Sequence, residues 1–311
     1  MDKHLILASS PHIHSGRSTS RIMLDVIIAI CPAAVAGVVI FGLRALLVLA
    51  VCIGSCVGFE ALFNLIVKRE QTLGDLSAIV TGLLLGMNLP ANIPIWQCVI
   101  GALFAMVVVK GLFGGLGNNP VNPAITARVF MLVAFGSMTK SAFPTIVDTA
   151  SGATPLSLAE GQAAPSLLQL FIGTHGGAIG ETCAAALIAG GIYLIVRRVI
   201  TWQIPVTFIG TVFVCSLIME SFNFTSALSA ILSGGLMIGA IFMATDYVTS
   251  PVTAWGKAIF GIGAGLITFL IRYFGVYPEG VSFAILLMNI VTPYINSWTK
   301  HKVFGTGGKK Q

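Results

Sequence analysis

Charged residues are scarce in this sequence. Asp, Glu, Lys and Arg together make up 9% of the 311 residues, whereas a soluble domain carries roughly 25%. Hydrophobic residues account for 56%, and the mean hydropathy is +0.95. So few charges cannot cover the surface of a soluble enzyme of this length, and the long apolar runs lack the alternating pattern of a membrane β-barrel. The composition therefore predicts an all-α, polytopic membrane protein.

Several familiar signatures of binding are missing as well. None of the six cysteines forms a CxxC pair, and there is no P-loop, dinucleotide fingerprint or iron–sulfur pattern. The five histidines make no metal site with their sequence neighbours, so we expect no metal ion. The net charge of +6 comes from basic residues scattered between apolar runs, and we therefore expect no nucleic-acid partner.

Ten apolar segments approach the length of about 20 residues that crosses a lipid bilayer. They cover 22–43, 45–67, 76–91, 94–112, 122–138, 179–197, 204–220, 226–244, 255–272 and 280–298. These segments divide the chain into an N-terminal arm (1–21), a first transmembrane region (22–138), a connecting loop (139–178), a second transmembrane region (179–298) and a basic tail (299–311).

Basic residues orient the predicted spans. Ten spans place both termini on one side, and with that side cytoplasmic, fourteen Lys and Arg face the cytoplasm and three face the other side. This asymmetry agrees with the positive-inside rule. We therefore expect a multi-pass protein of the cell membrane (the cytoplasmic or inner membrane), with both termini cytoplasmic and the 139–178 loop extracytoplasmic.

A short internal repeat indicates the arrangement of the spans. The stretch LSAIVTG at 76–82 resembles LSAILSG at 228–234, which lies 152 residues later. A second copy after five spans, an odd number, inserts upside down, as in many transporters. The predicted fold is therefore two inverted five-helix repeats, with chance similarity as the alternative. Each copy leads into a polar, proline-containing stretch, 88–94 or 244–251, which is either part of a binding site or a simple span end.

Acidic residues inside or beside membrane spans are costly and indicate function by default. Glu60 lies within the second predicted span, and Asp246 follows the eighth. With neighbouring hydroxyl groups these acids offer oxygen ligands to a cation. We predict an ion path that includes Asp246, Glu60, Thr245 and Thr249. In the alternative, each acid pairs with an arginine or caps a helix, which is the interpretation we favour for Glu181 and Glu220.

The loop sequence DTASGATPL at 148–156 presents a hydroxyl group. Small residues leave little bulk beside Thr154, and the proline that follows it disfavours helical backbone at this threonine. Asp148 and Ser151 supply polar neighbours. Taken alone, this stretch predicts an ordinary turn in a Ser/Thr-rich loop.

The same loop resembles the DxxSGAT flavinylation motif of membrane redox subunits, in which a separate flavin transferase esterifies a threonine to the phosphate of FMN. Four further stretches resemble the NqrB/RnfD family: SPHIHSG at 10–16, GNNPVNPA at 117–124, GAIGE at 177–181 and ATDYVTSP at 244–251. The resemblance covers nearly the whole chain. The SGATPL sequence at 151–156 and the short N-terminus look more like those of RnfD members than like those of NqrB members.

This resemblance implies a flavoprotein subunit of the ion-translocating Rnf complex, which couples electron transfer between ferredoxin and NAD to movement of Na⁺ or H⁺. FMN would be covalently linked to Thr154, in a motif that also includes Asp148, Ser151 and Gly152. The implied partners are the other membrane, flavin and iron–sulfur subunits, the flavin transferase and the lipid bilayer. Ferredoxin and NAD would bind other subunits, so this chain would hold no catalytic residue and no complete activity alone.

The resemblance also implies a second, noncovalent flavin such as riboflavin. Asn118, Asn119 and Asn122 carry amides that suit the polar edge of a flavin ring, although asparagine before a span equally suits a helix N-cap. Two other classes of function stay open at this point. One is a cofactor-free inverted-repeat channel or secondary transporter, and the other is an assembly subunit whose motif is vestigial.

Overall fold

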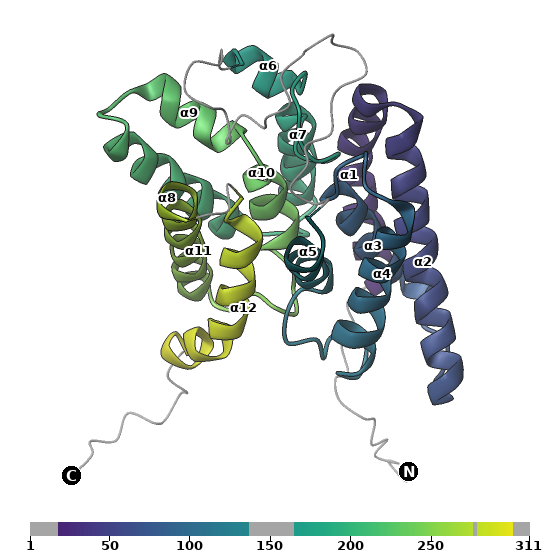
Figure 1. Cartoon of the computed structure of the whole chain (residues 1–311). Helices are drawn as coiled ribbons and strands as arrows, with labels where there is room; N and C mark the ends of the chain where they lie inside the picture. Colours follow the sequence, from purple (N-terminus) through teal and green to yellow (C-terminus); the bar gives the residue numbers. More distant parts are fainter. Residues whose placement is uncertain (1–17, 137–164, 276–278, 301–311) are drawn as a thin grey trace, which may run out of the picture.

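The structure, a computed structural model, describes residues 18–136, 165–275 and 279–300. Within these ranges the regular secondary structure is helical, which confirms the all-α class for the described part of the chain. The helices form a bundle with two parts, one from each side of the segment 137–164 (Figure 1).

The helices before that segment begin with two long ones and continue with shorter pieces. In chain order they are α1 (Thr19–Phe41), α2 (Leu43–Val67), the 3₁₀ turn η1 (Leu73–Asp75), α3 (Ser77–Met87), α4 (Ile95–Leu103) with its π-helical continuation η2 (Phe104–Gly111), and α5 (Pro123–Ala134).

The second part begins with a short surface helix. Its elements are α6 (Leu167–Ile172), α7 (Ala184–Val196), α8 (Gln203–Met219), α9 (Phe224–Leu232), α10 (Leu236–Ile238) with its π-helical continuation η4 (Gly239–Met243), α11 (Ala254–Phe274) and α12 (Val281–Trp298).

Local sequence explains where several helices begin. The side chains of Ser18, Asn122, Asn223 and Thr253 each accept hydrogen bonds from backbone N–H groups in the first turn of the helix that follows. Gly42 separates α1 from α2 with a φ of 75°, a conformation that glycine adopts without strain. The chain thus reverses direction between its first two long helices.

The helix lengths and composition support a multi-pass membrane protein. Among the described residues, α1, α2, α11 and α12 are long and apolar enough to cross a membrane, and α9 with α10–η4 forms a fifth candidate that is bent by 66°. Five further apolar helical segments have 10–17 residues: α3, α4–η2, α5, α7 and α8. The count of ten spans and the domain boundaries therefore stay predictions. The expected 226–244 span is not one continuous helix, because the backbone breaks after Leu232 and Gly234 adopts a φ of 66°.

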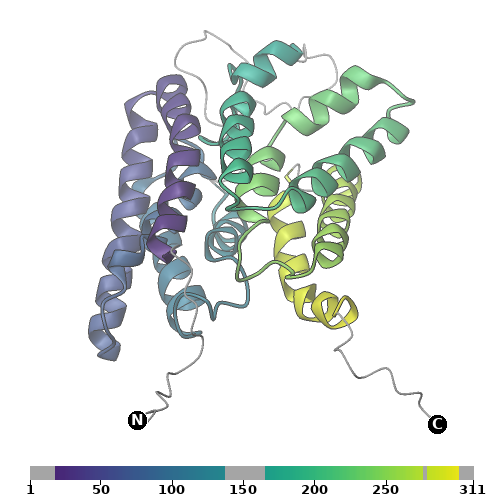
Figure 2. The same ribbon diagram turned by 180° about the vertical axis from the view of Figure 1, so that it is seen from behind.

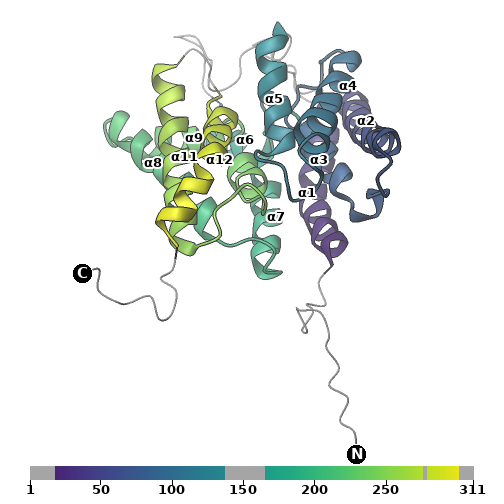
Figure 3. The same cartoon turned by 90° about the horizontal axis from the view of Figure 1, so that it is seen from below.

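The two parts of the chain meet along two pairs of helices. Helix α1 packs against α7, and α5 packs against α12. Seen from behind, purple α1 lies beside teal α7 (Figure 2), and the view from below places α5 next to the second part (Figure 3). In an inverted repeat, the first helix of one half would pack against the first helix of the other half, and the last against the last. The contacts α1–α7 and α5–α12 have this pattern, and the repeat itself stays a prediction.

Lys110 and Arg128 are among the fourteen basic residues that were counted as cytoplasmic, but both lie in helices instead of loops. Lys110 lies in η2 and is 4% exposed, and Arg128 lies in α5 and is 5% exposed. Each is buried with an acidic partner, so neither supports the orientation as an exposed loop charge would, and the side on which each lies stays a prediction. The basic tail and the ends of α2 and α7 still carry the asymmetry, and the sidedness of the chain stays a prediction.

Close approach of helix backbones depends on glycine at the α2–α3 contact. A Cβ at Gly82 would lie 2.7 Å from Ile53 Cα and 2.8 Å from Cys52 O, so Gly82→Ala should push α3 away from α2 at a cost of about 1–3 kcal/mol. The measurement is thermal unfolding of the purified protein in detergent. Gly58→Ala in α2 is the matched control, since nothing lies within 4 Å of its Cβ position. Equal unfolding midpoints for the two variants would contradict the packing described here.

Candidate functional site

Part of the predicted site lies outside the described residues. Asp148, Ser151, Gly152 and Thr154 all fall within the segment 137–164, so the flavin-bearing loop stays a prediction. In the ranges that the structure does describe, no group of three or more His, Cys, Asp or Glu could hold a metal ion.

A cavity of about 90 Å³ lies between the two parts of the chain. Its lining includes residues from α1, α3, α7 and η4, and the segments before α5 and after η4. The structure brings together at this central cavity four residues that the sequence had assigned to two separate sites: Asn119, Asn122, Thr245 and Asp246. Asn118 is exposed and is not part of the lining.

Asn122 is largely committed to holding the backbone. Its Oδ1 accepts hydrogen bonds from the N–H groups of Ala124 (3.0 Å) and Ile125 (3.3 Å), which confirms the N-cap alternative for this residue. Its Nδ2 donates to the carbonyl of Met243 at 3.3 Å and so joins α5 to η4. Asn119 is buried, and its Nδ2 donates to the carbonyl of Val121 at 3.0 Å.

Asp246 lies in the segment between η4 and α11. Thr249 donates its hydroxyl to Asp246 Oδ2 at 3.2 Å, and the Val248 N–H points to Oδ1 at 3.5 Å. Thr245 instead donates its hydroxyl to the carbonyl of Ile241 at 2.6 Å, so only Thr249 contacts the acid as predicted. Burial raises the pKa of the Asp246 carboxyl above its ordinary value, and these hydrogen bonds reduce the rise.

Glu60 is buried in α2 and pairs with a lysine. Lys110 Nζ lies 2.6 Å from Glu60 Oε1, and Thr72 donates its hydroxyl to the same oxygen at 2.9 Å. Asn64 donates to Thr72 Oγ1 at 3.1 Å, so the polar residue one turn after Glu60 joins the same network. The alternative of a paired acid is thus correct in kind, although the partner is Lys110 rather than an arginine.

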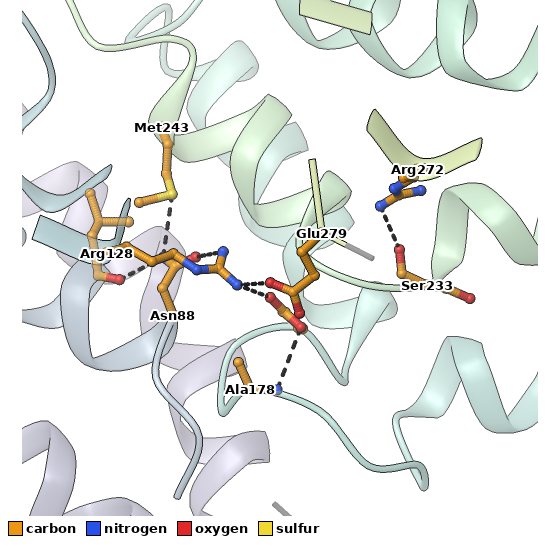
Figure 4. A network of polar contacts seen from close by, with 9 residues as sticks. Asn88, Arg128, Ala178, Ser233, Met243, Arg272 and Glu279 are labelled. Atoms are coloured by element: carbon orange, nitrogen blue, oxygen red, sulfur yellow. Dashed lines mark hydrogen bonds and ion pairs between the residues drawn. The ribbon is translucent and has the colours of Figure 1, made fainter. Parts of the chain in front are cut away.

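A buried cluster of charges joins the two parts of the chain. Arg128 of α5 donates to Asn88 Oδ1 at 2.7 Å and to Glu181 Oε1 at 2.8 Å, and it also pairs with Glu279. Figure 4 shows the guanidinium between Asn88 and the two carboxylates, with Met243 against Asn88. One cation therefore faces two acids that enter from segments before α7 and before α12.

This cluster was not predicted as a unit. For Glu181 the sequence favours pairing with an arginine or capping of a helix, and the structure pairs it with Arg128; Glu279 is not among the predicted residues. An arginine inside the apolar segment that became α5 was the available signal, because such residues rarely occur in membranes without a partner. Glu279 lies outside α11 and α12, and burial raises the pKa of its carboxyl to about 7, with Arg128 opposing the rise and Glu181 adding to it.

The fold and these contacts define a class: a helical, multi-pass membrane protein with buried ion pairs, one of which joins the two parts of the chain. The chain belongs to the NQR2, RnfD, RnfE family, whose model matches residues 6–305.

Curated relatives match over nearly their full length. The chain is 48% identical over 309 residues to the D subunit of the Na⁺-translocating ferredoxin:NAD⁺ oxidoreductase complex of Acetobacterium woodii, covering 97% of this chain and 96% of the relative. It is 42% identical over 320 residues to the D subunit of the proton-translocating complex of Clostridium ljungdahlii, with 96% of each chain covered. The D subunit of the ion-translocating oxidoreductase complex of Escherichia coli K12 is 36% identical over 345 residues, covering 96% of this chain and 98% of the relative.

Removing Arg128 should destabilise the chain strongly. Arg128→Met leaves the buried carboxylate of Glu181 and the partly buried carboxylate of Glu279 without their cation, which costs about 3–5 kcal/mol. Arg197→Met is the matched control, because Arg197 is exposed and its pair with Asp25 contributes about 0–1 kcal/mol. Thermal unfolding of both variants in detergent gives the comparison. An Arg128→Met midpoint no lower than that of Arg197→Met would show that the cluster does not hold the two parts together.

Proposed function

We propose that this chain is the flavin-bearing membrane subunit of an ion-translocating ferredoxin:NAD⁺ oxidoreductase complex. It passes electrons through FMN on Thr154 and couples their transfer to movement of Na⁺ or H⁺. The observation that carries the proposal is the DTASGAT sequence at 148–154 in a chain whose family and full-length relatives are subunits of such complexes. The relatives' names include both a Na⁺-translocating and a proton-translocating complex, so the proposal covers either ion.

Thr154 would tether FMN through a phosphoester, and the isoalloxazine supplies the redox chemistry. The contribution of this chain would be to position the Thr154 hydroxyl for attachment of FMN. Proline after Thr154 favours extended backbone at the threonine, and small residues before it leave its hydroxyl accessible to the transferase. Helix α6, which follows this loop, lies at the opposite end of the bundle from the C-terminal ends of α2 and α12 (Figure 1). That arrangement supports an extracytoplasmic loop and a cytoplasmic C-terminus.

A second, noncovalent flavin such as riboflavin would use the central cavity. Asn119 and Asp246 offer amide and carboxylate groups that suit the N3–H and carbonyl edge of the ring. The cavity of about 90 Å³ is, however, smaller than the roughly 300–1,000 Å³ of most ligand pockets. A flavin ring would therefore need a wider form of the cavity.

The ion path would run through the acids that line the two cavities, Asp246 and Glu60. Asp246 lines the central cavity, and Glu60 lines a second cavity that shares Lys110 with the first. Carboxylate and hydroxyl oxygens are the ligands that hard cations prefer, and the same carboxylates can carry a proton. Ferredoxin and NAD would bind other subunits of the complex, since the sequence has no nucleotide fingerprint and no iron–sulfur cysteine pattern.

Covalent flavin gives the test of this proposal. The chain is produced together with its flavin transferase, denatured, and examined by in-gel flavin fluorescence. Wild type should give a fluorescent band, and Thr154→Ala should lose it because the ester oxygen is gone. Thr149→Ala, in the same loop but away from the ester, should keep the band.

The same gel distinguishes the alternatives. A dark wild-type band, with the transferase active on another substrate, would overturn the flavoprotein proposal and favour a cofactor-free channel or transporter. A band that persists in Thr154→Ala would place the flavin on another residue.

A further inference from the structure

Oxygen atoms surround the ammonium group of Lys110. Nζ lies 2.6 Å from Glu60 Oε1 and 2.7 Å from Ser77 Oγ. Thr72 donates to the same Glu60 oxygen, and Ser77 donates to Asp75 Oδ1 at 2.6 Å. The Glu60 carboxylate and the Ser77 hydroxyl contact the ammonium, and the Thr72 hydroxyl contacts the same carboxylate oxygen. These three groups form the kind of oxygen set that also binds a small hard cation.

One atom of this set has no partner. Glu60 Oε2 is buried and forms no hydrogen bond within the described residues, while the whole side chain is 6% exposed. A buried carboxylate oxygen without a partner carries a desolvation cost of about 1–3 kcal/mol or more. Lys110 therefore does not use the full binding capacity of Glu60, and the free oxygen is available to a ligand.

Lys110 also stands between two cavities. It lines the central cavity, which contains Asp246, and a second cavity of about 300 Å³. The lining of the second cavity includes Glu60, Asn64, Arg69, Glu70 and Thr72 from the end of α2 and the segment that follows it. The Glu60–Lys110 pair thus lies where a path from the second cavity to the central cavity would pass.

The backbone around Lys110 is π-helical. Lys110 lies in the last turn of η2, and η4 in the second part of the chain ends three residues before Asp246. Single π-helical turns occur often at functional sites, where they interrupt the regular α-helical register. The two charged residues that line the central cavity thus lie in or near π-helical backbone: Lys110 is part of η2, and Asp246 follows η4.

We propose that Lys110 is the gate of the ion path, and that its ammonium occupies a Na⁺ site formed by Glu60, Thr72 and Ser77. This inference rests on the proposed function, which assigns an ion path to the chain. One carboxylate balances one positive charge, so Na⁺ replaces the ammonium instead of joining it. Lys110 then moves within the central cavity toward Asp246, for which the described residues supply no ion-pair partner. Return of Lys110 to Glu60 expels Na⁺ and closes the path.

The gate is tested by passive Na⁺ entry into liposomes that contain the whole complex, with no electron donor or acceptor present. Lys110→Met should raise the entry of ²²Na⁺ about tenfold or more, equivalent to a barrier lower by about 1.4 kcal/mol. Lys110→Arg should remain closed because the positive charge is kept. Lys257→Met is the matched control, since Lys257 is hydrogen-bonded to the Thr201 hydroxyl at an exposed site.

A lysine that served only to hold α2 against η2 would not control permeation. If Lys110→Met keeps its flavin band and its electron transfer but leaks no more Na⁺ than Lys257→Met, the gate is overturned and the proposed function stands. A leak of protons without a leak of Na⁺ would overturn the Na⁺ assignment. Absence of covalent flavin and of ferredoxin-dependent NAD reduction in wild type would instead remove the proposed function.

A measurement on the wild-type complex covers the case in which Lys110→Met does not fold. During electron transfer, a hydrophobic carbodiimide is added and modification of Glu60 is measured by mass spectrometry. Na⁺ should protect Glu60, and choline at the same concentration should not, because only Na⁺ fits the oxygen set vacated by Lys110. Modification that is independent of Na⁺ would overturn the proposal.

Discussion

Burial of charge in an apolar bundle is the constraint on which this structure depends. An ionised group removed from water is tolerated only with a partner of opposite charge and with hydrogen bonds to its remaining atoms. Lys110 pairs with one oxygen of Glu60 between η2 and α2, and Arg128 connects α5 to Glu181 and Glu279 in the other part of the chain. Each pair therefore fixes the position of segments that are far apart in the sequence.

The same constraint applies to the backbone where helices are interrupted. Arg44 donates to carbonyl groups of the segment 88–94, and Arg272 donates to the carbonyls of Ala230 and Ser233 at the break after α9. Irregular backbone at membrane depth is tolerated only where protein or water partners its polar groups. An arginine beside each interruption supplies that partner. In both parts of the chain, therefore, an arginine side chain donates hydrogen bonds to the carbonyl groups of the interrupted helix.

How much the sequence predicts differs from element to element. The apolar run predicted at 255–272 is helix Ala254–Phe274, because length and composition alone define such a segment. The break inside the expected 226–244 span was not predicted, since Gly234 is compatible with both helix and turn. Charges were the least predictable feature.

Lys110 lies near the end of the apolar run at 94–112, and Arg128 lies within the run at 122–138, but neither position identifies a partner. Their partners are distant: Glu60 is 50 residues from Lys110, and Glu279 is 151 residues from Arg128. Only tertiary packing brings these residues together. Asn119 and Asp246 likewise line one cavity only because the fold brings them together, since the residues around each in the sequence do not predict this proximity.

The central claim is that buried acids of this chain couple electron transfer to ion movement. The most direct test measures Na⁺ and H⁺ uptake together with ferredoxin-dependent NAD reduction, in liposomes that contain the complex with Asp246→Asn. Asp25→Asn is the control, because Asp25 pairs with exposed Arg197 and is not among the residues that line the cavity. The account predicts that Asp246→Asn lowers ion uptake per electron transferred while flavin content is retained. Unchanged uptake per electron, or a proportionate loss of uptake, electron transfer and flavin, would contradict it.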